Sequence, residues 1–224
     1  MDTNKLINDL TQNLTPVRPV GSAPLRAMLF ILMSAIFLSA GLYLAGGPRP
    51  DLAFKMAEFS FLLENAAMTL AGLLATLAAF RLHVPDTRLR KNVILPLSLG
   101  SALWLLIAFH CCLGISPTHA LHQFREEASL DALHCATDLA LLVTAPLISA
   151  LLMLRRAAPV WHGWLGYATA LSLASFGAVG TRLLCDYDVH AHLILWHFLP
   201  VFIMAFVGSL IGQGIKDFKK KIRL

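Results

Sequence analysis

The sequence predicts an all-α integral membrane protein, a bundle of six transmembrane helices with a short cytoplasmic helix at its N-terminus. Of its 224 residues, 57 % are hydrophobic and only 14 % are charged, whereas soluble domains carry about 25 % charged residues. Its apolar residues also fall into six runs, each long enough for the roughly 20 helical residues that a bilayer core requires. A water-soluble core cannot use so much apolar surface, so we assign the chain to membrane proteins.

The N-terminal segment, residues 1–26, is polar with one helical pattern. Its apolar side chains follow the spacing of a single face of a three-turn helix, and they are Leu6, Ile7, Leu10 and Leu14. Pro16 and Pro19 end this helix and favour an extended linker. Two interpretations stay open, a helix that lies on the membrane or bundle surface and a docking helix that places its apolar stripe in a groove of a soluble partner.

The apolar runs that follow define the transmembrane domain, residues 27–215. We expect its six spans at residues 27–45, 59–80, 93–113, 132–154, 161–184 and 193–215. Residues 216–224 form a basic tail. The six spans leave no room for a separate soluble domain.

The distribution of basic residues predicts the orientation of the bundle. Fourteen of the 18 Lys and Arg residues lie in the N-terminal segment, the turns between spans two and three and between spans four and five, and the tail. The other loops hold the remaining four. Cytoplasmic loops of membrane proteins are enriched in Lys and Arg, so both termini are expected in the cytoplasm.

This orientation gathers thiols and imidazoles at the outer ends of the spans. All four cysteines lie there, and so do seven of the nine histidines. The densest stretch runs from Leu184 to His197. Cys111 and Cys112 end the third span and are expected to serve in packing, since cysteine is readily buried.

The fourth span opens with a group of candidate metal ligands. Asp131 and Cys135, like His134 and Asp138, are spaced at i and i+4 and therefore adjoin on a helix. Together with the outer loop, the candidate ligands or ligand-orienting residues are His134, Asp131, Asp138, Asp186, His190, His192 and His197. Cysteine and histidine suit zinc, copper or a soft heavy metal. In an oxidising compartment, Cys135 and Cys185 can instead form a disulfide if their Cα atoms lie within about 7 Å.

Two further patterns concern the interior of the spans. Glu64 and Asp138 place carboxylates inside apolar runs, which is costly and indicates a partner or a cavity. Gly208 and Gly212 form a GxxxG pattern in the last span, which lets helix backbones approach closely. We expect this pattern to pack against another helix of the same chain.

Short motifs along nearly the whole chain resemble the NrsF family, negative regulators of extracytoplasmic-function sigma factors in bacteria. The motifs are Leu6-Ile7-Asn8-Asp9-Leu10, Leu14-Thr15-Pro16-Val17-Arg18-Pro19, Arg49-Pro50-Asp51-Leu52, Phe61-Leu62-Leu63-Glu64, Ala79-Phe80-Arg81-Leu82-His83-Val84-Pro85, Cys135, Leu184-Cys185 and Leu195-Trp196-His197. The resemblance implies a six-span anti-sigma factor of the inner membrane that holds its sigma factor inactive at the cytoplasmic face.

The resemblance also implies that heavy metal or oxidant is sensed by two outer cysteines, and the matching positions are Cys135 and Cys185. Leu6, Ile7, Leu10 and Leu14 then become the candidate contacts with the sigma factor. A regulator of this kind is not an enzyme, needs no obligatory cofactor and makes no direct contact with nucleic acid. Its only cofactor would be a transient metal ion at the outer face.

Two other functions share some of these features. A membrane thiol oxidoreductase that reduces quinone would also use outer cysteines, but the chain has no CxxC motif. A transporter of metal ions or protons would need polar groups near the midplane of the bilayer, whereas here they crowd one end. The identity of the sigma factor, the signal, the oligomeric state and the choice between metal coordination and disulfide formation stay open.

Overall fold

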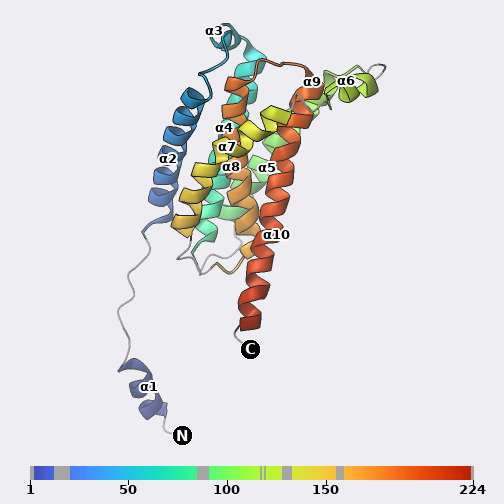
Figure 1. The fold of residues 1–224 in the computed structure, drawn as a ribbon. Coiled ribbons are helices and arrows are strands. Elements are labelled where there is room, and N and C mark those ends of the chain that lie inside the picture. The colour runs from blue at the N-terminus through green and yellow to red at the C-terminus, as the bar shows by residue number, and fades with distance from the viewer. Residues whose placement is uncertain are drawn as a thin grey trace.

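The computed structural model describes residues 3–12, 21–84, 91–116, 118, 120–127, 133–154 and 159–222. All regular structure within these ranges is helical, so the all-α prediction is confirmed there (Figure 1). The helices are α1 (Thr3–Thr11), α2 (Ala23–Leu44), α3 (Leu52–Lys55), α4 (Phe59–Leu82), α5 (Lys91–Leu113), α6 (Ala120–Glu127), α7 (Leu133–Leu154), α8 (His162–Leu184), α9 (His190–His192), the π-helix η2 (Leu193–Phe198) and α10 (Leu199–Ile222).

Five helical segments of the described chain are long and apolar enough to cross a membrane. They are α2, α4, α5, most of α7, and the continuous run of α9, η2 and α10 up to Ile215. The helix α2 begins at Ala23, four residues before the expected start, because Pro24 lies in its first turn, where proline favours a helix start. The expected span at 161–184 forms α8, which has 23 residues but does not reach the same hydropathy. Five of the six predicted spans are therefore clearly candidate membrane helices, and α8 is the one that is not.

The lower hydropathy of α8 has a structural reason, because this helix lies at the centre of the bundle (Figure 1). It contacts α2, α4, α7 and α10, and thirteen of its residues are buried. Its small polar side chains bond to neighbouring helices: the hydroxyls of Ser172 and Thr76 lie 2.6 Å apart, and Trp104 Nε1 donates to Ser175 Oγ over 2.7 Å. Such side chains lower the hydropathy of a helix without exposing a polar group to an apolar solvent.

Glycines bring α8 and α10 into close backbone contact. A Cβ atom built on Gly166 or Gly208 would overlap the backbone of the other residue, and one on Gly212 would overlap the carbonyl of His162. The GxxxG pattern of Gly208 and Gly212 thus packs within the chain, as the sequence predicted. Close packing of this kind is a main source of association between apolar helices in a bilayer, where lipid tails are as apolar as the helix surfaces.

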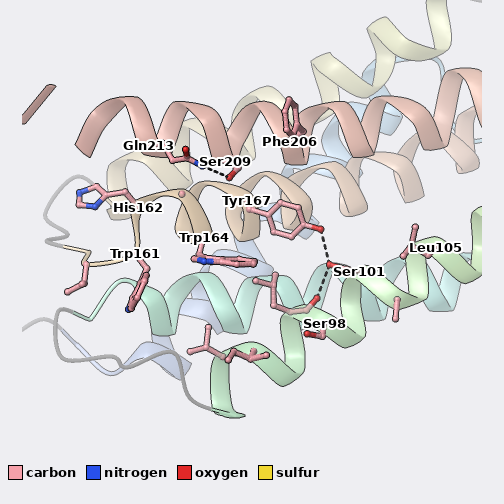
Figure 2. Close-up of a pocket in the computed structure, with 16 residues that line it drawn as sticks. Ser98, Ser101, Leu105, Trp161, His162, Trp164, Tyr167, Phe206, Ser209 and Gln213 are labelled. Carbon is pink, nitrogen blue, oxygen red and sulfur yellow. Dashed lines mark hydrogen bonds between the residues drawn. The ribbon is translucent and has the colours of Figure 1, made fainter. Parts of the chain in front are cut away.

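Near the start of α8, helices α5 and α10 lie on opposite sides of α8 and are separated from each other. They leave a cavity of about 920 Å³ with mostly apolar walls. Figure 2 shows Trp161, Trp164 and Tyr167 on one side of it, with Ser101 of α5 hydrogen-bonded to the Tyr167 hydroxyl at 2.9 Å.

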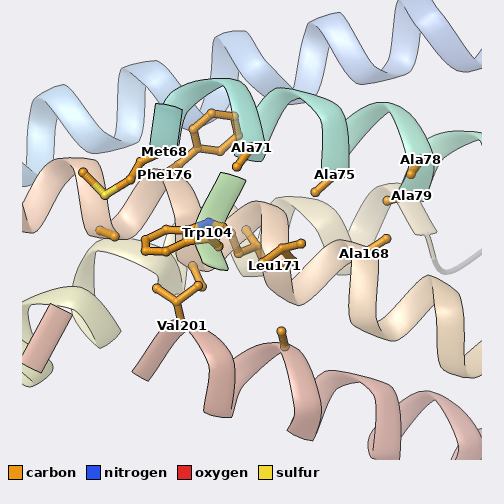
Figure 3. Packing of buried hydrophobic residues seen from close by; sticks show 14 of the residues in the cluster. Met68, Ala71, Ala75, Ala78, Ala79, Trp104, Ala168, Leu171, Phe176 and Val201 are labelled. Carbon is orange, nitrogen blue, oxygen red and sulfur yellow. The ribbon is translucent and has the colours of Figure 1, made fainter. Parts of the chain in front are cut away.

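The hydrophobic core fills the middle of the bundle (Figure 3). Met68, Ala71 and Ala75 of α4 face Trp104 of α5 and Leu171 of α8. The Trp104 ring also packs edge-on against Phe198 of η2, with ring centroids 5.6 Å apart. These contacts fix the start of the last span against α5 and α8, which positions the histidines of η2 and α9.

Candidate cysteine and histidine site

Four buried side chains from three separate parts of the chain converge at one end of the bundle. Cys135 lies in the first turn of α7, Cys185 follows α8 directly, His192 ends α9 and His197 lies in η2. Their relative exposures are 1 %, 7 %, 1 % and 0 %. We call these four side chains the Cys₂His₂ cluster.

The atoms of the Cys₂His₂ cluster that can bind a metal face one another. All four lie within 4.8 Å of one another. The two sulfur atoms are 3.4 Å apart, and Cys185 Sγ is 3.5 Å from His192 Nε2. Both cysteines are free thiols in the structure, so the arrangement suits either a metal ion or an oxidation that joins the two sulfurs.

A π-helical segment explains how His192 and His197 come to share a face. In an α-helix, residues five apart are rotated by about 140° and point in different directions. In a π-helix the hydrogen bonds run from i to i+5, so residues five apart lie nearly above one another. Leu193–Phe198 is π-helical, and Pro200 follows it. The proline ring clashes with the carbonyl four residues earlier, that of Trp196, which favours a widened turn there.

Glu127 at the end of α6 holds His192 from the other side. Its carboxylate lies 2.9 Å from His192 Nδ1, and its backbone carbonyl accepts a 2.8 Å hydrogen bond from Trp196 Nε1. The Tyr187 ring stacks on the His192 ring at a centroid distance of 5.2 Å. The bond to Nδ1 leaves Nε2 of His192 directed toward Cys185.

The surroundings of Cys185 favour its thiolate. A hydrogen bond from Cys135, together with contacts to His192 and His197, lowers the pKa of the Cys185 thiol below its ordinary value, although burial opposes this. A thiolate is the form of cysteine that binds metals and attacks oxidants.

Arg49 connects the loop between α2 and α3 to the segment that carries Cys185. Its side chain is 1 % exposed. Its guanidinium donates to the carbonyl of Cys185 over 2.8 Å, to Asp51 over 2.6 Å and to Asp188 over 2.9 Å. Its backbone N–H also donates to the carbonyl of Leu183 over 2.8 Å. Arg49, from the loop between α2 and α3, thus fixes the backbone around Cys185.

Asp188 joins Arg49 to a second buried arginine. Arg182 donates to Asp188 over 2.7 Å and pairs with Glu64 of α4 at 3.3 Å. Lys55 also lies 3.0 Å from Asp188. The Arg182 guanidinium lies over the Phe61 ring at 4.9 Å. Glu64 therefore has the partner that a carboxylate in a span requires, and that partner lies outside the Cys₂His₂ cluster.

Among the described residues, the other predicted ligands do not enter the Cys₂His₂ cluster. The side chains of His134, Asp186 and His190 are exposed, and Asp138 is half-buried. Asp131 lies outside the described residues. Of the two cysteines expected to serve in packing, Cys111 is buried and Cys112 is exposed.

The N-terminal helix is present as predicted, although its apolar face is only partly described. Residues Thr3–Thr11 are helical, and Ile7 is 52 % exposed. The side chains of Leu6 and Leu10 and the whole of Leu14 lie outside the described part of the chain.

Sequence reasoning missed Glu127, Arg49 and Asp188. Glu127 and His192 are 65 residues apart, and no spacing pattern links them. A signal did exist for Arg182, because a charged residue at the end of an apolar run requires a partner such as Glu64.

Comparison with known proteins yields a family for this chain. The family model described as NrsF, negative regulator of sigma F, matches residues 10–215. No curated protein and no solved structure matches the chain. The matched range includes the Cys₂His₂ cluster, Glu127 and the charged residues around Asp188.

Proposed function

The chain belongs to the NrsF family of negative regulators of sigma F, and from this we propose that it is a membrane-bound anti-sigma factor whose outer cysteines sense the signal. Family membership makes it a negative regulator of a sigma factor. We propose further that the partner is of the extracytoplasmic-function class, is held inactive at the cytoplasmic face of the bacterial inner membrane, and is released under heavy-metal or oxidative stress.

The observation that carries the sensing part is the proximity of Cys135 and Cys185. Two buried thiols from different helices have their sulfur atoms 3.4 Å apart. A metal ion can bridge them, or an oxidant such as a peroxide can take two electrons while the thiols lose two protons and form a disulfide. Either event changes how the ends of α7 and α8 pack, and a partner that binds one packing better is then released by linkage.

The proposed sixth span is α8. A helix of 23 residues is about 34 Å long, enough to cross the hydrocarbon core. Its neighbours α4, α7 and α10 separate it from lipid along much of its length. Six crossings put both termini on one side, and the excess of Lys and Arg there supports a cytoplasmic location.

The partner surface is proposed to include α1. The exposure of Ile7 fits a helix whose apolar face is free to bind in a groove of the sigma factor. The test is a pull-down of the sigma factor encoded beside this protein, with and without residues 1–20. Retained binding after the deletion would rule out α1 as the docking helix.

The sensing part has its own test in a strain with a reporter for the sigma factor. Replacing Cys135 or Cys185 by Ser is expected to abolish induction by metal and oxidant. Cys112→Ser is the matched control, since this exposed cysteine of α5 lies outside the Cys₂His₂ cluster. Unchanged induction in the Cys135 and Cys185 variants would exclude them as the sensor.

A membrane thiol oxidoreductase is the second candidate, because the fold supplies a close cysteine pair although the sequence has no CxxC motif. Such an enzyme would oxidise a dithiol substrate and pass two electrons and two protons to a quinone. Catalytic turnover by the purified protein would favour the enzyme over the regulator.

A further inference from the structure

One histidine of the Cys₂His₂ cluster has ring nitrogens whose hydrogen-bonding capacity the described protein groups leave unused. His197 is fully buried, and neither of its ring nitrogens makes a hydrogen bond of ordinary geometry within the described residues, although one of them lies within 4.8 Å of the Cys185 sulfur. A buried polar group without a partner costs about 1–3 kcal/mol. We infer that Cys135, Cys185, His192 and His197 together form a four-ligand site for a divalent ion of the Zn²⁺ class, with Glu127 as the residue that orients His192.

The distances suit tetrahedral coordination. Zinc binds sulfur at about 2.3 Å and imidazole nitrogen at about 2.0–2.1 Å, so a tetrahedral site separates two sulfurs by about 3.8 Å and a sulfur from a nitrogen by about 3.6 Å. The corresponding separations are 3.4 Å between the cysteines and 3.5 Å between Cys185 and His192. An ion therefore needs shifts of only a few tenths of an ångström along these two edges.

The donor set selects the class of metal. Two thiolates and two imidazoles in a compact group suit Zn²⁺, whereas Ca²⁺ and Mg²⁺ require oxygen ligands. The carboxylate of Glu127 lies 2.9 Å from Nδ1 of His192 and stays outside the ligand set. A carboxylate in this position fixes the tautomer and ring orientation of a metal-binding histidine.

Metal binding and disulfide formation exclude each other at this site, because both use the sulfurs of Cys135 and Cys185. A bound ion is therefore expected to slow oxidation of the pair. The inference rests on the proposed function for its biological purpose, but the binding measurements below use neither a sigma factor nor a signal.

The test uses the reduced full-length protein in detergent micelles, with Cys112→Ser as the background so that an exposed thiol does not contribute. Titration with Co²⁺, which replaces Zn²⁺ and is coloured, is expected to give the visible bands of tetrahedral cobalt and a thiolate-to-cobalt charge-transfer band. Both should saturate at a single equivalent and disappear when Zn²⁺ is added.

Variants distinguish the ligands from the other histidines of the same end. Loss of an orienting carboxylate weakens metal binding about 10- to 100-fold, so Glu127→Gln is expected to fall in this range. His192→Gln and His197→Gln should weaken binding by more than about 100-fold, since each removes a direct ligand. His134→Gln and His190→Gln are the matched controls, because both side chains are exposed, and they should bind as the background protein does.

A second measurement on the unaltered ligand set guards against misfolded variants. Zn²⁺ is expected to slow peroxide-driven loss of the Cys135 and Cys185 thiols at least about tenfold, as bound thiolates are no longer free to attack the oxidant. Octahedral cobalt spectra, equal affinities in all histidine variants, or no protection by Zn²⁺ would each overturn the inference. Sigma-factor binding is measured separately, so a protein that binds its partner but not Co²⁺ contradicts only the metal site.

Discussion

Asp188 is the residue on which the charges beside Cys185 converge. Partial burial raises the pKa of this carboxyl, but hydrogen bonds from Arg49, Arg182 and Lys55 outweigh burial and hold the pKa well below its ordinary value of 3.8. Because the folded-state pKa is below the unfolded value, the ionised carboxylate stabilises the fold fully above about pH 4. That contribution is lost as the pH falls through the folded-state pKa.

We predict that Asp188→Asn lowers the free energy of unfolding at pH 7 by about 2 kcal/mol. Breaking a fully buried ion pair costs about 3–5 kcal/mol, and partial exposure of Asp188 reduces this. The difference from the parent protein should shrink as the pH falls below about 4, where the carboxyl becomes protonated in the unfolded chain while it stays ionised in the folded protein. It should be lost once the pH falls through the folded-state pKa. Thermal unfolding of the purified protein, followed by tryptophan fluorescence at several pH values, measures both effects.

Asp186→Asn provides the control for this prediction. Its side chain is exposed, and the residue contacts Arg49 through its backbone carbonyl, 3.3 Å from Nη2. Equal destabilisation by the two substitutions would show that the charge of the loop matters rather than the contacts of Asp188.

At the residue level, the sequence predicted which side chains lie near one end of the bundle but not which of them face inward. His134 and Cys135 are neighbours in the chain, yet one is exposed and the other buried, because successive residues of a helix are rotated by about 100°. Orientation of a helix about its own axis depends on its neighbours. Glu127 was missed for the same reason, since only tertiary packing brings it to His192.

At the level of elements, apolar runs predicted the positions of the long helices well. The expected range 59–80 forms α4, Phe59–Leu82, and 93–113 forms most of α5. The π-helix was not predicted, because hydropathy does not distinguish i to i+5 from i to i+4 hydrogen bonding. Consequently the pairing of His192 with His197, which an α-helix would separate, could not be found from sequence spacing.

The contact between α8 and α10 gives a prediction for an element pair. Gly208→Ala is expected to destabilise the protein by about 1–3 kcal/mol, the usual cost of overpacking a filled interior. The added methyl group would meet Ala170 Cβ at 2.5 Å and also the backbone of Gly166. The thermal midpoint in detergent is the measurement.

Gly214→Ala is the matched control on the same helix. A Cβ atom there has nothing within 4 Å, so this change should leave the midpoint unchanged or raise it slightly through higher helix propensity. A midpoint lowered equally by both substitutions would mean that glycine acts through helix flexibility rather than through packing against α8.

For the whole molecule, the number of membrane crossings decides where the partner meets the protein. With α8 as a sixth span, α10 ends at the same end of the bundle at which α2 begins (Figure 1). We therefore predict that green fluorescent protein fused to either terminus fluoresces, because both termini then lie in the cytoplasm. Alkaline phosphatase inserted at Gly47 should be active, because this enzyme is active only outside the cytoplasm and the loop then lies there. Phosphatase activity at the C-terminus, with a fluorescent N-terminal fusion, would instead indicate five crossings.

Communication between the Cys₂His₂ cluster and a distant partner surface must obey linkage. If Zn²⁺ binding weakens the affinity for the sigma factor by some factor, the sigma factor must weaken Zn²⁺ binding by the same factor, and couplings of this kind are about 5- to 150-fold. We predict such a reciprocal change in two titrations, one of the sigma factor with and without Zn²⁺ and one of Zn²⁺ with and without the sigma factor.

His197→Gln should abolish the effect of Zn²⁺ on sigma-factor affinity while preserving sigma-factor binding in the absence of Zn²⁺. Two unequal factors, or no coupling in a protein that binds both ligands, would separate the metal site from the control of the sigma factor.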